Sequence, residues 1–158
     1  MDALLAGVEQ SDFVAALKTS FFVYPLINAV HVLAIGVLFT TVALMDLRVI
    51  GFFRNAEPGV PIPLLRTIAL SAFAVAALTG LTLFSVNARD YVANPAYLAK
   101  MSLLVLAIVN FLVFLKLAGP AGERPDLHPV PVAARVAAAL SLLLWLAIAV
   151  CGRFIGFL

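Results

Sequence analysis

Four long runs of apolar residues alternate with short, polar and proline-rich connections along the chain. A helix rises about 1.5 Å per residue, so a run of about 20 residues crosses the roughly 30 Å hydrocarbon core of a bilayer. We predict membrane-spanning helices at about 25–45, 64–86, 95–116 and 132–153. Pro25, and Asn94 followed by Pro95, are typical of helix starts. The pattern predicts an all-α fold, an integral membrane four-helix bundle that forms one domain over residues 1–158.

The first 20 residues follow a different pattern, in which acidic and apolar residues are mixed. Asp2, Glu9 and Asp12 precede Lys18, the first basic residue. A cleaved signal peptide begins with basic residues before its apolar core, so cleavage is not expected here. We predict a short N-terminal interfacial helix within about 1–20.

Composition and charge narrow the class of protein and of partner. Apolar residues make up 65% of the chain and charged residues 11%, whereas roughly a quarter of residues are charged in soluble domains. The formal charge is only +2 and the basic residues are scattered, so the basic patch of a nucleic-acid-binding protein is missing. The single cysteine, Cys151, cannot form an internal disulfide. We predict membrane lipids as the surroundings and no nucleic-acid partner.

The distribution of Lys and Arg predicts an orientation. Four spans place both termini on one side, and six of the ten Lys and Arg flank the first and third connections on the other side. Cytoplasmic connections carry the excess of basic residues. We therefore predict a protein of the bacterial inner membrane with both termini in the periplasm. The half of the bundle near the termini is then the outer half.

The only histidine within a span, His31, lies in the first span, three residues after Asn28. Ionisable side chains at bilayer depth usually face the bundle interior and mark functional sites. Asn28 and His31 share a helix face, and Thr79, Lys100 and Arg153 lie at a similar depth in the other spans. We predict that these residues surround a polar pocket in the outer half. The alternative for His31 is an interhelical hydrogen bond to Thr79 or to a backbone carbonyl, and the alternative for Lys100 is a side chain that reaches the headgroups.

Two further side chains are predicted to have structural roles. Asp46 closes the first span on the opposite side, where it would cap the helix and pair with Arg54 or Arg66. Trp145 lies near the middle of the fourth span, where core packing with its N–H bonded is expected. Neither is predicted to form part of a binding site.

A pattern of single residues recurs along the spans, namely His31, Asp46-Leu47-Arg48, Thr79-Gly80, Lys100, residues 141–145 and Gly152-Arg153. This combination resembles an uncharacterised family of small bacterial four-span membrane proteins, over nearly the whole chain, and the resemblance implies no established activity. More distantly, the His-bearing first span is similar to the membrane domains of D-type copper-resistance proteins and to four-helix b-type cytochromes. That similarity implies haem b or copper as cofactor. The chain departs from many relatives in having Asn28 where they have Glu, and in having no His around Leu115.

These observations lead to two hypotheses of different kinds. In the first, the protein is a redox or metal-handling membrane protein in which His31 binds haem iron or copper. Met101 or Cys151 would supply a second ligand, since thioether and thiolate sulfurs suit these metals. In the haem version, Lys100 and Arg153 would pair with the propionates.

The second hypothesis is a non-catalytic accessory subunit or bundle that binds lipid, a protein partner or a second copy of itself, with no cofactor. The spans lack the paired acidic residues and broken helices of an ion path, which disfavours a transporter. No nucleophile with a neighbouring base, phosphate loop or paired carboxylates is visible in the sequence, so an enzyme is not favoured.

Overall fold

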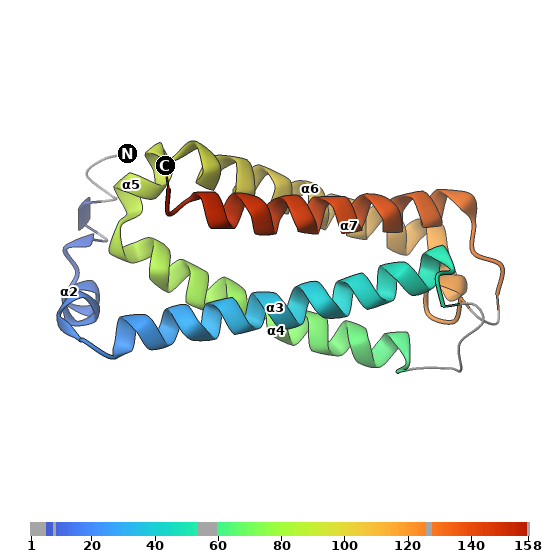
Figure 1. Cartoon of the computed structure of the whole chain (residues 1–158), viewed down its shortest axis with the longest axis horizontal. Coiled ribbons are helices and arrows are strands. Elements are labelled where there is room, and N and C mark those ends of the chain that lie inside the picture. Colours follow the sequence, from blue (N-terminus) through green and yellow to red (C-terminus); the bar gives the residue numbers. More distant parts are fainter. Residues whose placement is uncertain (1–5, 8, 54–59, 126–127, 158) are drawn as a thin grey trace.

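The computed structural model describes residues 6–7, 9–53, 60–125 and 128–157, and every regular element in this part of the chain is helical (Figure 1). The elements are α2 (Asp12–Thr19), α3 (Val23–Ile50), α4 (Ile62–Val86), α5 (Ala88–Ala93), α6 (Pro95–Ala118), the 3-10 turn η1 (Gly119–Gly122) and α7 (Val132–Phe154). The predicted all-α fold is confirmed.

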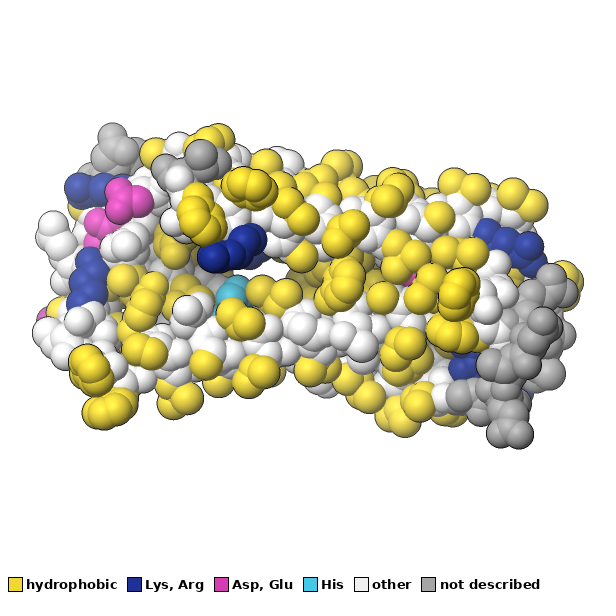
Figure 2. All heavy atoms as spheres, in the orientation of Figure 1, with side chains coloured by type: hydrophobic (Ala, Val, Ile, Leu, Met, Phe, Trp, Pro, Cys, Tyr) yellow, Lys and Arg dark blue, Asp and Glu magenta, His cyan; other side chains and the backbone are white. Residues whose placement is uncertain are grey.

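The four long helices, α3, α4, α6 and α7, are long and apolar enough to cross a membrane. Large apolar side chains cover their outer faces (Figure 2), as expected of helices that are apolar all round and face lipid. The four helices therefore fit the predicted membrane four-helix bundle.

The long helices begin largely where the sequence predicts. Asn94 caps α6, because its side-chain oxygen accepts hydrogen bonds from the backbone N–H groups of Ala96 and Tyr97 at 2.9 and 3.2 Å. Helix α3 differs, since it continues past residue 45 to Ile50. It ends at Gly51, whose φ of 99° lies in the left-handed region that glycine tolerates. The segment Asp46-Leu47-Arg48 therefore lies within the last turns of the helix.

The bundle consists of two antiparallel helix pairs, α3 with α4 and α6 with α7. The pairs contact each other mainly through α3 and α7, whereas α4 and α6 have very few contacts in the described part of the chain. Both termini, α2 and α5 lie at one end (Figure 1). We call the half that contains this end the terminal half, and the half that contains the α3–α4 and α6–α7 connections the loop half.

Helix α2 packs against α3 and α4 at the terminal end, with Val14 and Leu17 buried. Glu9 accepts a hydrogen bond from the backbone N–H of Arg89 at 2.9 Å, which links the N-terminal segment to α5. Helix α2 occupies the described part of the segment predicted as an interfacial helix.

Small residues make the close contacts in the loop half. Ala134 and Ala138 of α7 are 0% and 1% exposed and pack with Val49 of α3 and Ile62 of α4. Small side chains allow the backbones of membrane helices to approach closely, which stabilises packing where lipid provides no hydrophobic drive.

Candidate functional site

His31 of α3 is hydrogen-bonded to the neighbouring helix. Its Nδ1 lies 2.9 Å from Thr79 Oγ1 of α4, and that oxygen also lies 2.7 Å from the carbonyl oxygen of Val75. A carbonyl only accepts and a hydroxyl has a single proton, so Thr79 donates to Val75 and accepts from His31 Nδ1–H. A neutral His31 then keeps the lone pair on Nε2. The predicted interhelical bond to Thr79 is confirmed, and it leaves Nε2 as the nitrogen that can bind a metal.

Gly80 provides the space in which the imidazole lies. A Cβ atom added to Gly80 would meet His31 Cε1 at 3.0 Å, which is too close for the ring to keep its position. Gly36 of α3, by contrast, has nothing within 4 Å of such an atom. A larger residue in place of Gly80 would therefore force the imidazole beside it to shift.

Lys100 of α6 lies in a similar arrangement in the other helix pair. Its side chain is half-buried and runs against Gly152 of α7, where an added Cβ would lie 3.5 Å from Nζ. No described residue accepts a hydrogen bond from the ammonium group. Lys100 is close enough to His31 to interact with it electrostatically.

The other predicted site residues are placed differently. Asn28 is exposed, and Met101 is 38% exposed. Arg153 is also exposed, with its guanidinium carbon 4.6 Å from the centre of the Phe157 ring. Cys151 is half-buried and near Lys100. The structure thus brings together His31, Thr79 and Lys100, while a second metal ligand stays a prediction. Among the described residues, no three His, Cys, Asp or Glu side chains form a group that could hold a metal ion.

Aromatic side chains join the helices at the terminal end. The rings of Phe84, Tyr91 and Tyr97 have centroids 5.4 to 6.0 Å apart, and Tyr91 of α5 is hydrogen-bonded to Tyr24 of α3. Burial raises the pKa of the Tyr91 hydroxyl above its ordinary value, and the two neighbouring tyrosines add to the shift. This cluster connects α3, α4, α5 and α6 at the terminal end of the bundle, beyond His31.

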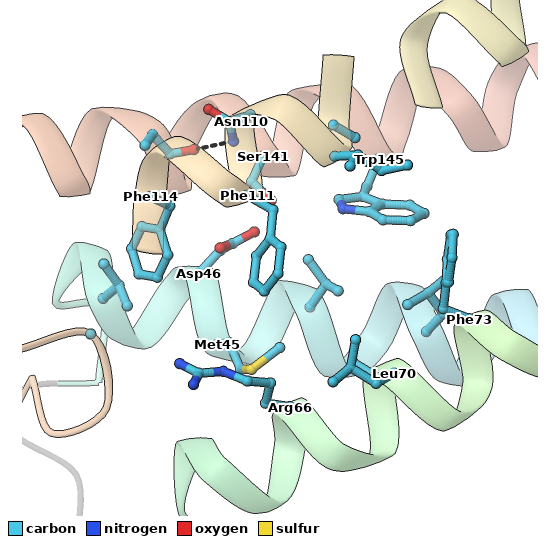
Figure 3. A pocket seen from close by; sticks show the side chains of 18 of the residues that line it. Met45, Asp46, Arg66, Leu70, Phe73, Asn110, Phe111, Phe114, Ser141 and Trp145 are labelled. Carbon is cyan, nitrogen blue, oxygen red and sulfur yellow. Dashed lines mark hydrogen bonds between the residues drawn. The ribbon is translucent and has the colours of Figure 1, made fainter. Parts of the chain in front are cut away.

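A second candidate site, which the sequence did not reveal, lies in the loop half. A cavity of about 270 Å³ lies among α3, α4, α6 and α7. Its wall is apolar except for one polar side chain from each helix, namely Asp46, Arg66, Asn110 and Ser141 (Figure 3). Asp46 is only 9% exposed, and its Oδ2 is buried without a hydrogen-bond partner among the described residues.

The structural role predicted for Asp46 needs correction. Arg66 does not pair with Asp46 but with Glu123, at 3.1 Å, and Arg54 lies outside the described residues. The reason is the length of α3: because the helix continues beyond Asp46, this residue lies on the same buried face as Leu38 and Val49. The core packing predicted for Trp145 is confirmed, because its side chain packs against two clusters of buried residues, and it also lines the cavity. One polar residue per span at a common depth was the signal that could have found this site.

The comparisons with known proteins give a family. No curated protein and no solved structure matches the chain. A family described as a family of unknown function (DUF6644) matches residues 8–158, which include all four long helices and both candidate sites. The predicted membership of an uncharacterised family is confirmed, and the likeness to D-type copper-resistance proteins and b-type cytochromes stays a prediction. The chain belongs to this family of unknown function, DUF6644.

Proposed function

We propose that the protein binds haem b in the terminal half of the bundle, with His31 Nε2 as an axial ligand to the iron. The hydrogen bond from His31 Nδ1–H to Thr79 supports this proposal best. Metal-ligating histidines almost always donate their other ring N–H to an acceptor, which fixes the tautomer and the ring orientation. Thr79 supplies that acceptor, and Gly80 makes room for the ring.

Haem would suit the site better than copper, because the porphyrin nitrogens would hold the iron and His31 alone would be enough as a protein ligand. Haem also carries two carboxylates, and the half-buried ammonium of Lys100 has no acceptor among the described residues. A charge-assisted bond to a propionate would satisfy it. When bound, haem supplies one-electron chemistry. Copper would need further donors, of which Cys151 near Lys100 is one candidate and Met101 another.

A second candidate function is a cofactor-free bundle that binds lipid, a partner protein or a second copy. The observation that favours it is the same bond to Thr79, which satisfies His31 as an interhelical contact. For either function we further propose that the protein resides in a bacterial inner membrane with periplasmic termini, on the distribution of Lys and Arg.

The test is the absorption spectrum of the detergent-purified protein, oxidised and then reduced, with analysis for iron and copper. We expect a Soret band that shifts on reduction and is lost in His31→Ala. The matched control is His128→Ala, which removes the only other histidine and should keep the band. Bound copper without a Soret band would overturn the haem proposal and identify copper as the cofactor. A colourless, metal-free protein after haem supplementation would overturn the proposal and favour the cofactor-free bundle.

A further inference from the structure

The loop-half cavity has the size of a small-molecule site. Its volume of about 270 Å³ exceeds the roughly 150 Å³ of a dry apolar cavity that binds benzene. The wall includes four aromatic rings, those of Phe73, Phe111, Phe114 and Trp145 (Figure 3). A molecule with one ring and a short chain therefore fits the available space.

The carboxyl group of Asp46 gives the cavity its chemistry. Ser141 of α7 interacts with this group, but Oδ2 is left buried and unpartnered among the described residues. A buried carboxylate oxygen without a donor is costly, and nearly all such atoms in proteins are satisfied. A ligand with an N–H or O–H group would supply the missing donor.

The charge around Asp46 favours a cationic ligand. Asp46 is the only acidic side chain on the cavity wall in the described part of the chain, and Arg66 is the only basic one. The Arg66 guanidinium is paired with Glu123 at 3.1 Å and extends away from the Asp46 carboxylate (Figure 3). A neutral alcohol would donate a hydrogen bond but leave the charge of an ionised Asp46 uncompensated. A protonated amine supplies both the hydrogen bond and the compensating positive charge.

The aromatic walls favour the same ligand class. The faces of Trp and Phe rings attract cations, and cages of aromatic side chains recognise organic ammonium groups. The cavity is also accessible from the side, since Leu70 of α4 and Ile108 of α6 line it and are 55% and 43% exposed. An apolar amine dissolved in the bilayer could thus enter between these two helices.

We propose that the loop-half cavity binds a small lipophilic amine, whose ammonium group donates a hydrogen bond to Asp46 Oδ2 and whose apolar part contacts Phe111 and Trp145. This site is separate from the site of the proposed haem.

Trp145 is the only tryptophan of the chain, so its fluorescence reports on the cavity directly. We would titrate the detergent-purified full chain with 2-phenylethylamine and with propylbenzene, a neutral molecule of nearly the same shape. We expect saturable fluorescence changes, with the amine binding about ten- to a hundredfold more tightly, the range for one hydrogen bond to a charged group. Equal binding of the two probes, or no saturable binding of the amine, would overturn the proposal, and this comparison needs no variant.

A matched pair of variants then tests the carboxylate. Asp46→Asn keeps the shape of the side chain and should lose the preference for the amine, while Asp90→Asn, at an exposed acid of α5, should keep it. An Asp46→Asn protein that elutes as the native species and still prefers the amine would contradict the role of Asp46. Failure here leaves the Soret band of the wild type unaffected, so the two proposals fail separately.

Discussion

The terminal and loop halves of the bundle place polar side chains in opposite situations. His31 and Asp46 both belong to α3 and are separated by about 22 Å along the helix. His31 has a hydrogen bond to Thr79, whereas Asp46 Oδ2 has no described partner. A hydrogen-bonded polar group is compatible with packing as well as with ligand binding, but an unsatisfied buried one requires a further partner. The hydrogen-bond partners of a buried polar side chain therefore indicate a binding site better than its mere presence in a membrane span does.

The two halves also place their small residues differently. In the loop half, Ala134 and Ala138 are almost fully buried. In the terminal half, His31 and Lys100 lie against the glycines Gly80 and Gly152. Substitutions can therefore show whether each half depends on its small residues.

The largest effect on stability is expected from a substitution of Ala138, which is 1% exposed. Ala138→Leu inserts a larger side chain into close-packed helices and should lower the free energy of unfolding by about 1–3 kcal/mol. The control is Ala139→Leu at the next, exposed position, which should have little effect. Thermal unfolding in detergent measures both, and equal midpoints for the two variants would contradict the tight packing assigned to the loop half.

A smaller effect is expected at Gly80. Alanine in place of glycine within a helix gains about 0.5–1 kcal/mol from backbone entropy, and Gly36→Ala should show this gain because nothing lies within 4 Å of the new Cβ. Gly80→Ala should lose the gain, because its Cβ meets the His31 ring at 3.0 Å. The difference between the two unfolding midpoints is the measurement. Identical shifts would mean that the imidazole does not depend on Gly80.

The smallest effect is a pH dependence at the terminal end. Burial raises the pKa of Tyr91 above its ordinary value of 10.0, so the folded state favours the neutral hydroxyl. Stability should then fall as the pH rises above that ordinary value and through the raised pKa. Tyr91→Phe should remove this part of the loss of stability at alkaline pH. In a pH titration followed by tyrosine absorbance, the variant should lack one tyrosine with a raised pKa. A Tyr91 that titrates at its ordinary pKa would contradict its burial.

The sequence was sufficient for the spans, and it offered Thr79 as one of two alternative hydrogen-bond partners of His31. Span length follows from apolar run length, and the depth of a residue follows from its position along the helix. Rotation of each helix about its axis could not be predicted, because helices that are apolar all round carry no marker of the inward face. Lys100 and Arg153 were therefore both predicted to face the pocket, although the structure half-buries Lys100 and exposes Arg153.

The cavity was missed for a related reason. The sequence placed Asp46 at a helix end, where pairing with Arg54 or Arg66 would be enough to explain an acidic residue. Only the continuation of α3 to Ile50, together with the few contacts between α4 and α6, shows that Asp46 faces a space among four helices. Interhelical gaps depend on how the two helix pairs dock, and no local pattern in the chain specifies this.

We propose that the two halves of the bundle hold two separate sites, one for haem and one for an amine. The most direct test measures both ligands in both variants: the Soret band and 2-phenylethylamine binding, each in His31→Ala and in Asp46→Asn. Sites separated by about 22 Å along one helix should behave independently. We predict that His31→Ala loses the Soret band but keeps the tight binding of the amine. We predict that Asp46→Asn keeps the Soret band but binds the amine no more tightly than propylbenzene. A folded variant that loses both ligands, or one that loses the ligand of the other half, would contradict the separation of the two sites.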